Sequence, residues 1–70
     1  MKFTDVSSQR AVKAFQKAGF LVIRDSGGHV ILVRDSDMIT IPRHKRLNPF
    51  TLKAIIEDSG LTEKEFKDLL

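Results

Sequence analysis

Three short apolar runs, joined by connections of only a few residues, constrain this chain more than any other feature. The runs are residues 20–24, 30–34 and 38–41, and they are rich in β-branched residues, which favour strands. The connections contain Gly27-Gly28 and Asp35-Ser36-Asp37, residue types that form tight turns. Strands joined this closely pair antiparallel. The middle of the chain therefore predicts a three-stranded antiparallel sheet.

Helices are predicted on both sides of this sheet in the sequence. The residues that begin and end them are Ser7 or Ser8 and Gly19 for the first helix, Asn48, Pro49 and Gly60 for the second, and the capping-box pair Thr62 and Glu65 for a short third. These are preferred N-cap, first-turn and C-terminal residue types. The predicted fold is α+β, in the order α-β-β-β-α with a short C-terminal helix and the helices packed on one face of the sheet.

The apolar residues of the helices recur at helical spacing and define the predicted core. They are Ala11, Val12 and Phe15 in the first helix, Leu52, Ile55 and Ile56 in the second, and Phe66, Leu69 and Leu70 in the third. Residues 20–24 are expected to form a strand of a buried sheet. We expect Phe15, Phe20, Phe50 and Phe66 to pack in the core rather than to stack on bases. The 70 residues are enough for one domain, residues 1–70, with a small core.

The charges are unevenly distributed along the chain. Residues 1–53 contain ten Lys and Arg against four Asp, whereas residues 54–70 contain two Lys against five Asp and Glu. No acidic residue occurs between residues 38 and 56, where Arg43, Lys45, Arg46 and Lys53 lie. This basic cluster has two interpretations, a surface that binds the phosphates of a nucleic acid and a solvated loop.

Composition also excludes some classes of chemistry. The chain has no Cys, which rules out disulfides and thiolate catalysis. No apolar run approaches the ~20 residues of a membrane span, and the first residues lack the apolar segment of a secretory signal. We therefore expect a cytoplasmic protein without a membrane partner.

A single histidine, His29, follows the Gly27-Gly28 turn. An unperturbed histidine has a pKa of ~6.5 and can exchange protons near neutral pH. The ring is therefore a candidate for acid–base chemistry on a polyanion, and the alternative is a polar strand residue bonded to a neighbouring carbonyl. The two glycine N–H groups can approach a phosphate closely because no Cβ intervenes. Alternation places His29 on the face of Ile31 and Val33, but both faces of this strand are apolar.

A second histidine, His44, lies within the basic loop. It is a candidate phosphate ligand or acid, and the alternative is a loop residue that positions the basic segment. His29 and His44 are fifteen residues apart and no acidic pair is spaced to complete a site, so no metal site is predicted. Arg24 and Arg34, at opposite ends of the hairpin, either extend the basic surface or are charges of an edge strand.

Four stretches in this order, residues 14–20, 24–29, 39–44 and 51–56, resemble a known family. The chain is similar to the HicA toxins of bacteria and archaea, small mRNA interferases of type II toxin–antitoxin systems, whose fold is like that of the double-stranded RNA-binding domain. Residues 24–29 look like the Gly-Ser-His active-site turn of that family. At the position of the serine that precedes the histidine in that family, this chain has Gly28.

The resemblance implies a toxin that acts as a metal-independent endoribonuclease on mRNA, with no cofactor, with His29 as the catalytic histidine and with a HicB-type antitoxin as partner. The charges and the glycine N–H groups add a predicted RNA-binding set, which is Gly27, Gly28, Arg43, His44, Lys45, Arg46 and Lys53. Two alternatives remain, a non-catalytic RNA- or DNA-binding module of the same fold and a domain that binds only a partner protein.

Overall fold

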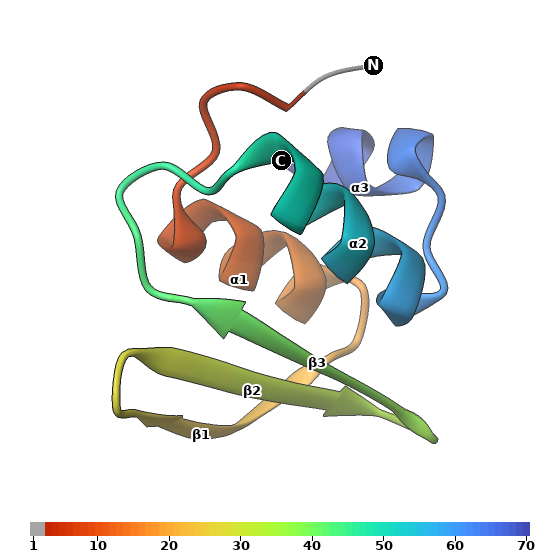
Figure 1. Ribbon diagram of the computed structural model, residues 1–70. Coiled ribbons are helices and arrows are strands. Elements are labelled where there is room, and N and C mark those ends of the chain that lie inside the picture. The colour runs from red at the N-terminus through yellow and green to blue at the C-terminus, as the bar shows by residue number, and fades with distance from the viewer. Residues whose placement is uncertain (1–2) are drawn as a thin grey trace.

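A computed structural model describes residues 3–70 and confirms the predicted α+β fold. The elements are α1 (Ser8–Lys17), β1 (Leu21–Ser26), β2 (His29–Arg34), β3 (Asp37–Pro42), α2 (Pro49–Ser59) and α3 (Glu63–Leu69). The strands form one antiparallel sheet in the order β1-β2-β3. The three helices lie on one side of this sheet and leave its other side open (Figure 1).

The helices begin at the capping residues that the sequence indicates. The Ser7 hydroxyl accepts a hydrogen bond from the Arg10 N–H, and the Asn48 side chain accepts one from the Phe50 N–H at 2.8 Å. Thr62 and Glu65 form a reciprocal capping box at the start of α3. Each of these side chains satisfies N–H groups that have no partner within the helix.

The turn between β1 and β2 is tighter than we predicted from the sequence. Gly27 and Gly28 have φ angles of +64° and +80°, and two residues with positive φ make the hairpin turn that suits the twist of the flanking strands. β1 therefore continues to Ser26 and β2 starts at His29, whose direct partners across the sheet are Ser26 on β1 and Pro42 on β3.

The core lies between the sheet and the helices. Val30 and Leu32 of β2 are buried against it, while Ile31 and Val33 are only partly covered on the other side. The predicted Phe15, Phe20 and Phe66 are all in the core, and so is Phe3. Three edge-on or tilted ring contacts link these four side chains. Aromatic pairs at such angles stabilise the core beyond the area that they bury.

The prediction that residues 20–24 form a strand of a buried sheet is wrong for most of this segment. Phe20 is buried, but every residue of β1 is exposed, including Leu21 and Ile23. β1 is an edge strand, and its pairing with β2 shifts between Val22 and Arg24, so Ile23 is the extra residue of a β-bulge. Among the strands, α1 and α2 pack mainly on β3, at the other edge.

Two further apolar residues, Phe50 and Leu70, were predicted to lie in the core but do not. Phe50 is 81% exposed at the start of α2, and Leu70 is partly exposed after the last turn of α3. The buried residues of α2 are Leu52, Ile55, Ile56 and Ser59. At 100° per residue, Phe50 projects about 200° away from Leu52 and therefore faces away from the buried stripe.

Candidate active site

His29 lies on the open side of the sheet, at the tip of the β1–β2 hairpin. It occupies the strand face of Ile31 and Val33, and its ring is exposed. Its Nδ1 atom is 3.2 Å from the carbonyl oxygen of Gly27. Because a carbonyl oxygen only accepts hydrogen bonds, this contact fits the tautomer with the proton on Nδ1. In that tautomer Nε2 carries a lone pair and can accept a proton.

Two polar side chains of β1 share this face with His29. Ser26 is its direct cross-strand partner, and Arg24 pairs with Ile31, so both lie on the same side of the sheet. Arg24 Nε donates a hydrogen bond to Ser26 Oγ at 3.1 Å, which directs the guanidinium group along β1 toward the hairpin tip. A cation and a hydroxyl thus accompany the imidazole, although Ser26 was not among our predicted site residues.

Arg43 is bound on the opposite side of the hairpin. Its guanidinium makes a two-fold ion pair with the carboxylate of Asp25, and Asp25 is paired with Val30, whose side chain faces the core. The backbone N–H of Arg43 also donates to the Gly28 carbonyl at 2.8 Å. These contacts fix the start of the basic loop to the residue that precedes His29. The Arg43 and Asp25 side chains remain nearly half exposed, at 44% and 46%.

The backbone of His44 is anchored to the first residue of α1. Ser8 Oγ donates to the His44 carbonyl at 3.1 Å and accepts from its N–H at 3.2 Å, and the Ser8 N–H donates to the same carbonyl. Ser8 itself is buried. Its role as the anchor of the basic loop has no signal in the sequence, because the two residues are 36 positions apart.

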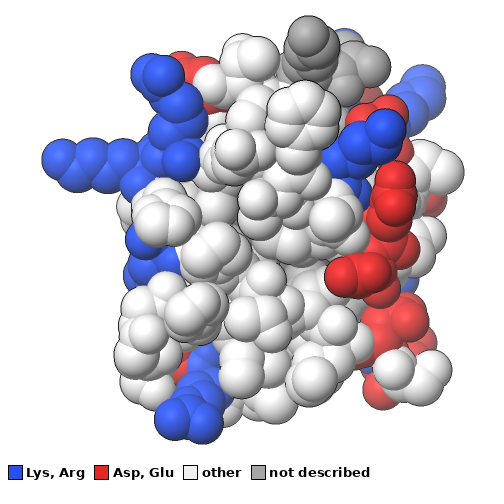
Figure 2. Space-filling model, in the orientation of Figure 1, with Lys and Arg blue, Asp and Glu red and all other residues white. Residues whose placement is uncertain are grey.

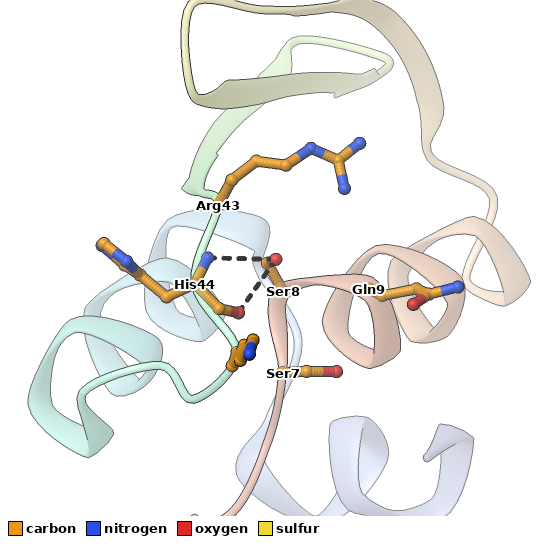
Figure 3. A pocket seen from close by; sticks show the side chains of 6 residues that line it. Ser7, Ser8, Gln9, Arg43 and His44 are labelled. Carbon is orange, nitrogen blue, oxygen red and sulfur yellow. Dashed lines mark hydrogen bonds between the residues drawn. The ribbon is translucent and has the colours of Figure 1, made fainter.

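A shallow hollow of about 380 Å³ lies between this loop and the start of α1 (Figure 3). Its lining residues are Ser7, Ser8, Gln9, Arg43, His44 and Lys45. The side chains of Ser7, Gln9 and Arg43 extend to one side, whereas the ring of His44 points to the other (Figure 3). Cationic, hydroxyl and amide groups suit a phosphate group, which would compete with the Asp25 carboxylate for the Arg43 guanidinium.

The remaining predicted cations are more loosely placed. Arg46 lies 3.6 Å from Asp5 in a pair whose side chains are 72% and 85% exposed, an arrangement that contributes little to stability. Lys53 is exposed on α2. In Figure 2 Lys and Arg residues gather at the upper left, where Figure 1 places the β3–α2 loop, whereas the lower left, near the hairpin tip, is mostly uncharged and most of the visible acidic residues lie at the right.

The sequence-predicted residues thus fall into two groups around the hairpin tip. His29 and the Gly27-Gly28 turn are on or beside the open face, and the loop residues from Arg43 onward start beside Gly28 and continue toward α1 and α2. Within residues 3–70, no three or more His, Asp or Glu side chains are grouped so that they could hold a metal ion. No helix in this part of the chain is long and apolar enough to cross a membrane.

Residues 8–61 match the family model described as the HicA toxin of bacterial toxin–antitoxin. The chain belongs to the HicA toxin family. The match covers α1, the three strands and α2, and with them every site residue predicted from the sequence. No curated protein gives a significant match to the chain.

Membership of the HicA family makes the protein the toxin of a toxin–antitoxin system, and an antitoxin is therefore its partner. In this HicA toxin the position before the histidine has a backbone that suits glycine. Gly28 has a φ of +80°, a conformation that costs a residue with a Cβ about 1–2 kcal/mol. The hydroxyl beside His29 comes from Ser26, across the turn.

Proposed function

We propose that this HicA toxin is an endoribonuclease that cleaves mRNA without a metal ion and uses His29 as its general base. The observation that carries the proposal is the contact between His29 Nδ1 and the Gly27 carbonyl. It orients an exposed ring at the hairpin tip and leaves Nε2 as the proton acceptor. A positioned general base contributes typically ~10²–10⁴-fold to a rate.

RNA supplies its own nucleophile in this reaction. His29 Nε2 takes the proton of a ribose 2′-OH, and the 2′-oxygen forms a bond to the adjacent phosphorus. The bond from phosphorus to the 5′-oxygen of the next nucleotide breaks, and that oxygen receives a proton, directly or through water, from the imidazolium that has formed. The products are a 2′,3′-cyclic phosphate and a 5′-hydroxyl, and the histidine returns to its neutral state.

The phosphate that reacts needs positive charge on the same side of the sheet as His29. Arg24, held along β1 by its bond to Ser26, is the cation that we assign to this role. Arg43 is bound to Asp25 on the other side, so we assign it, with Lys45, to the binding of a neighbouring phosphate in the hollow. Charge-assisted hydrogen bonds of this kind bind phosphate strongly, and the positive charge stabilises the transition state.

The alternative function is a non-catalytic RNA- or DNA-binding module. One observation favours it: Gly28 stands where the resemblance leads us to expect a serine. A hydroxyl at that position could touch the phosphate, and Ser26 approaches from a different strand. This alternative retains the basic surface and its salt-dependent affinity for nucleic acid but forms no product.

We also propose that a HicB-type antitoxin inhibits the toxin by covering His29 and the basic cluster of Arg43, Lys45, Arg46 and Lys53 with an acidic surface. Complementary potentials favour such an encounter. Substitution of Lys45 and Arg46 by Ala should then weaken the binding of RNA and of the antitoxin together. Intact affinity for the antitoxin in this variant would argue against a shared surface.

The direct test of the nuclease is the cleavage of mRNA in EDTA by the native protein and by His29→Ala. We expect the variant to lose at least about a hundredfold in rate. Since His29 is exposed, the variant should keep its circular dichroism spectrum. The variant Arg24→Ala retains His29. Slower cleavage by this variant would support the role of the cation on the same face.

Two further variants complete the experiment. His44→Ala tests whether a second imidazole supplies the acid, and we expect at most a few-fold loss because its ring points away from the hollow (Figure 3). Lys64→Ala, on α3, is a neutral control for loss of one surface charge. Binding of RNA without cleavage by the native protein would select the non-catalytic module instead.

A further inference from the structure

Phe50 is the most exposed of the large apolar side chains in residues 3–70, at 81%. The other four phenylalanines of the chain pack against one another in the core. A solitary exposed apolar residue is common on protein surfaces. A largely exposed aromatic ring that is flanked in the sequence by two exposed cations, Arg46 and Lys53, is a more specific feature.

The backbone beneath the ring is firmly held. The Phe50 N–H donates to Asn48 Oδ1 at 2.8 Å, within the N-cap of α2. Leu47, before the cap, and Leu52, after it, are fully buried. The start of α2 is therefore fixed on both sides of Phe50, so the ring can engage a ligand with only its own two side-chain torsions to be ordered.

The charged residues near Phe50 in the sequence are cations. Lys53 lies three residues further along α2 and is exposed, which places it on the neighbouring part of the same helix face. Arg46, in the loop just before the helix, is 72% exposed, and its pair with Asp5 at 3.6 Å is also exposed, so a phosphate can compete for it. No acidic residue occurs between residues 38 and 56. The same basic loop begins at Arg43, beside the hairpin tip that carries His29.

We infer that Phe50 stacks on an unpaired base of the bound RNA, while Lys53 contacts an adjoining phosphate. The inference rests on RNA being the ligand, as proposed above, and narrows the substrate to single-stranded segments, because a paired base in a duplex does not offer its face to a side chain. Aromatic rings next to a cationic path are the usual means of holding single strands, and the stacking tolerates any base. The strand would run from the hairpin tip along the basic loop to α2.

An antitoxin is the competing occupant, because exposed aromatic rings also anchor protein interfaces. The charges favour RNA, because the exposed Arg46 and Lys53 flank Phe50 in the sequence and can bind phosphates on either side of a stacked base. The exposed aliphatic residues on the sheet, such as Leu21 and Met38, provide apolar area without a ring. They supply matched controls for the loss of apolar surface alone.

The first test uses Phe50→Trp as a fluorescent reporter. The chain has no Trp and no Tyr, so the new indole is the only strong emitter. The full-length protein, with His29→Ala to prevent cleavage, is titrated with a ten-nucleotide oligouridylate and, separately, with inorganic polyphosphate. Stacking predicts quenching by the oligonucleotide and little change with polyphosphate, which has charge but no bases. Equal responses to both, or none with an oligonucleotide that binds, would overturn the inference.

The second test measures affinity for the same oligonucleotide. Phe50→Ala and Phe50→Leu should weaken binding roughly 5- to 100-fold, whereas Met38→Ala should leave it unchanged. Unchanged affinity in the Phe50 variants, with weaker binding of the HicB-type antitoxin, would overturn the stacking and assign the ring to the protein interface. Failure of the parent protein to bind any RNA at low salt would instead refute the proposed function itself, so the two failures are distinguishable.

Discussion

The two ends of the sheet use the same residue type, arginine, in opposite ways. At the end with the β2–β3 turn, Arg34 donates to the carbonyls of Ala18 and Ser59, at 2.9 and 3.2 Å, and its guanidinium lies 4.7 Å from the centre of the Phe20 ring. At the hairpin end, Arg43 pairs with the exposed carboxylate of Asp25. Arg34 binds carbonyl groups at the ends of α1 and α2, whereas Arg43 remains partly open to solvent.

The comparison shows under which conditions a positive charge stabilises the fold. The last carbonyls of a helix have no partner within it and carry partial negative charge, so a cation placed there both satisfies hydrogen bonds and favours the helix dipole. Arg34 does this for two helices at once. Arg43 meets only one exposed carboxylate, a contact of small net value, and a phosphate can compete for it. Both interpretations of Arg34 from the sequence are therefore wrong: β2 is the central strand and not an edge strand, and the guanidinium is bound to carbonyls of the fold and not part of the basic surface.

The largest effect should come from removing the structural arginine. We expect Arg34→Ala to lower the free energy of unfolding by about 2 kcal/mol, because two hydrogen bonds to a charged group and one cation–π contact are lost. Urea denaturation followed by circular dichroism measures this. Arg43→Ala, the matched variant at the other end, should cost less than about 1 kcal/mol. Equal losses would show that the two ends do not differ as described.

A second comparison concerns the two turns of the sheet. Gly28 has a φ of +80°, and Asp35, in the β2–β3 turn, has a φ of +52°. We expect Gly28→Ser to destabilise the protein by about 1–2 kcal/mol, although no atom beyond the chain neighbours lies within 4 Å of the added Cβ, because the cost lies in the backbone conformation. The stability of the variant is measured by urea denaturation.

Two controls sharpen this second prediction. Gly28→Asn should cost less than Gly28→Ser, since asparagine tolerates the left-handed conformation better. Asp35→Gly should be neutral or slightly stabilising, because it relieves the same kind of strain in the other turn. A stabilised Gly28→Ser variant would contradict the assigned turn geometry, and any gain in cleavage by that variant would be a separate effect on phosphate binding.

The elements of the fold could be predicted because their signals are local. Asn48, Thr62 and Glu65 mark the starts of helices by hydrogen bonds that span three residues or fewer, and Gly27-Gly28 marks a hairpin. The exposure of β1 could not be predicted in this way. Its apolar residues suit either face, and only the packing of α1 and α2 on β3 determines which strand is left at the open edge.

The site shows the same division between local and distant signals. The position of Ser26 opposite His29 follows from a two-residue turn and could have been predicted from the sequence. The exposure of Phe50 could also have been predicted, because Phe50 does not lie on the helix face formed by Leu52 and Ile55. The pairing of Arg43 with Asp25, 18 residues away, and the anchoring of His44 by Ser8 depend on tertiary contacts. No local pattern indicates them.

A smaller effect is expected in the salt dependence of RNA binding. Lys45 lines the hollow at the hairpin end, and Lys64 lies on α3 next to Asp68, in an exposed i,i+4 pair. Lys45→Ala should reduce the slope of log affinity against log salt by roughly 0.7, the value for one phosphate contact on a single strand. Lys64→Ala should leave the slope unchanged. The measurement is a series of fluorescence-anisotropy titrations at increasing salt, and equal slopes for both variants would remove the hollow from the RNA path.

The smallest expected effect is on the pH dependence of stability, and it concerns Glu65, near Arg34 at the end of the sheet with the β2–β3 turn. The hydrogen bonds from the backbone N–H and the side chain of Thr62 hold the pKa of the Glu65 carboxyl below its ordinary value of 4.5, with a further contribution from the charge of Arg34. A carboxyl whose pKa is lowered on folding stabilises the protein at pH values above its unfolded pKa, and this contribution is lost as the pH falls through the folded pKa.

Glu65→Gln keeps an acceptor for the Thr62 N–H but has no charge. The native protein should therefore be more stable than this variant at neutral pH, and the difference should shrink as the pH falls below 4.5. Urea denaturation at several pH values measures it, with Glu63→Gln, in the same helical turn but outside the capping box, as the control. A difference that is independent of pH would mean that the carboxylate charge plays no part in the capping box, and that the Arg34 end is stabilised by hydrogen bonds alone.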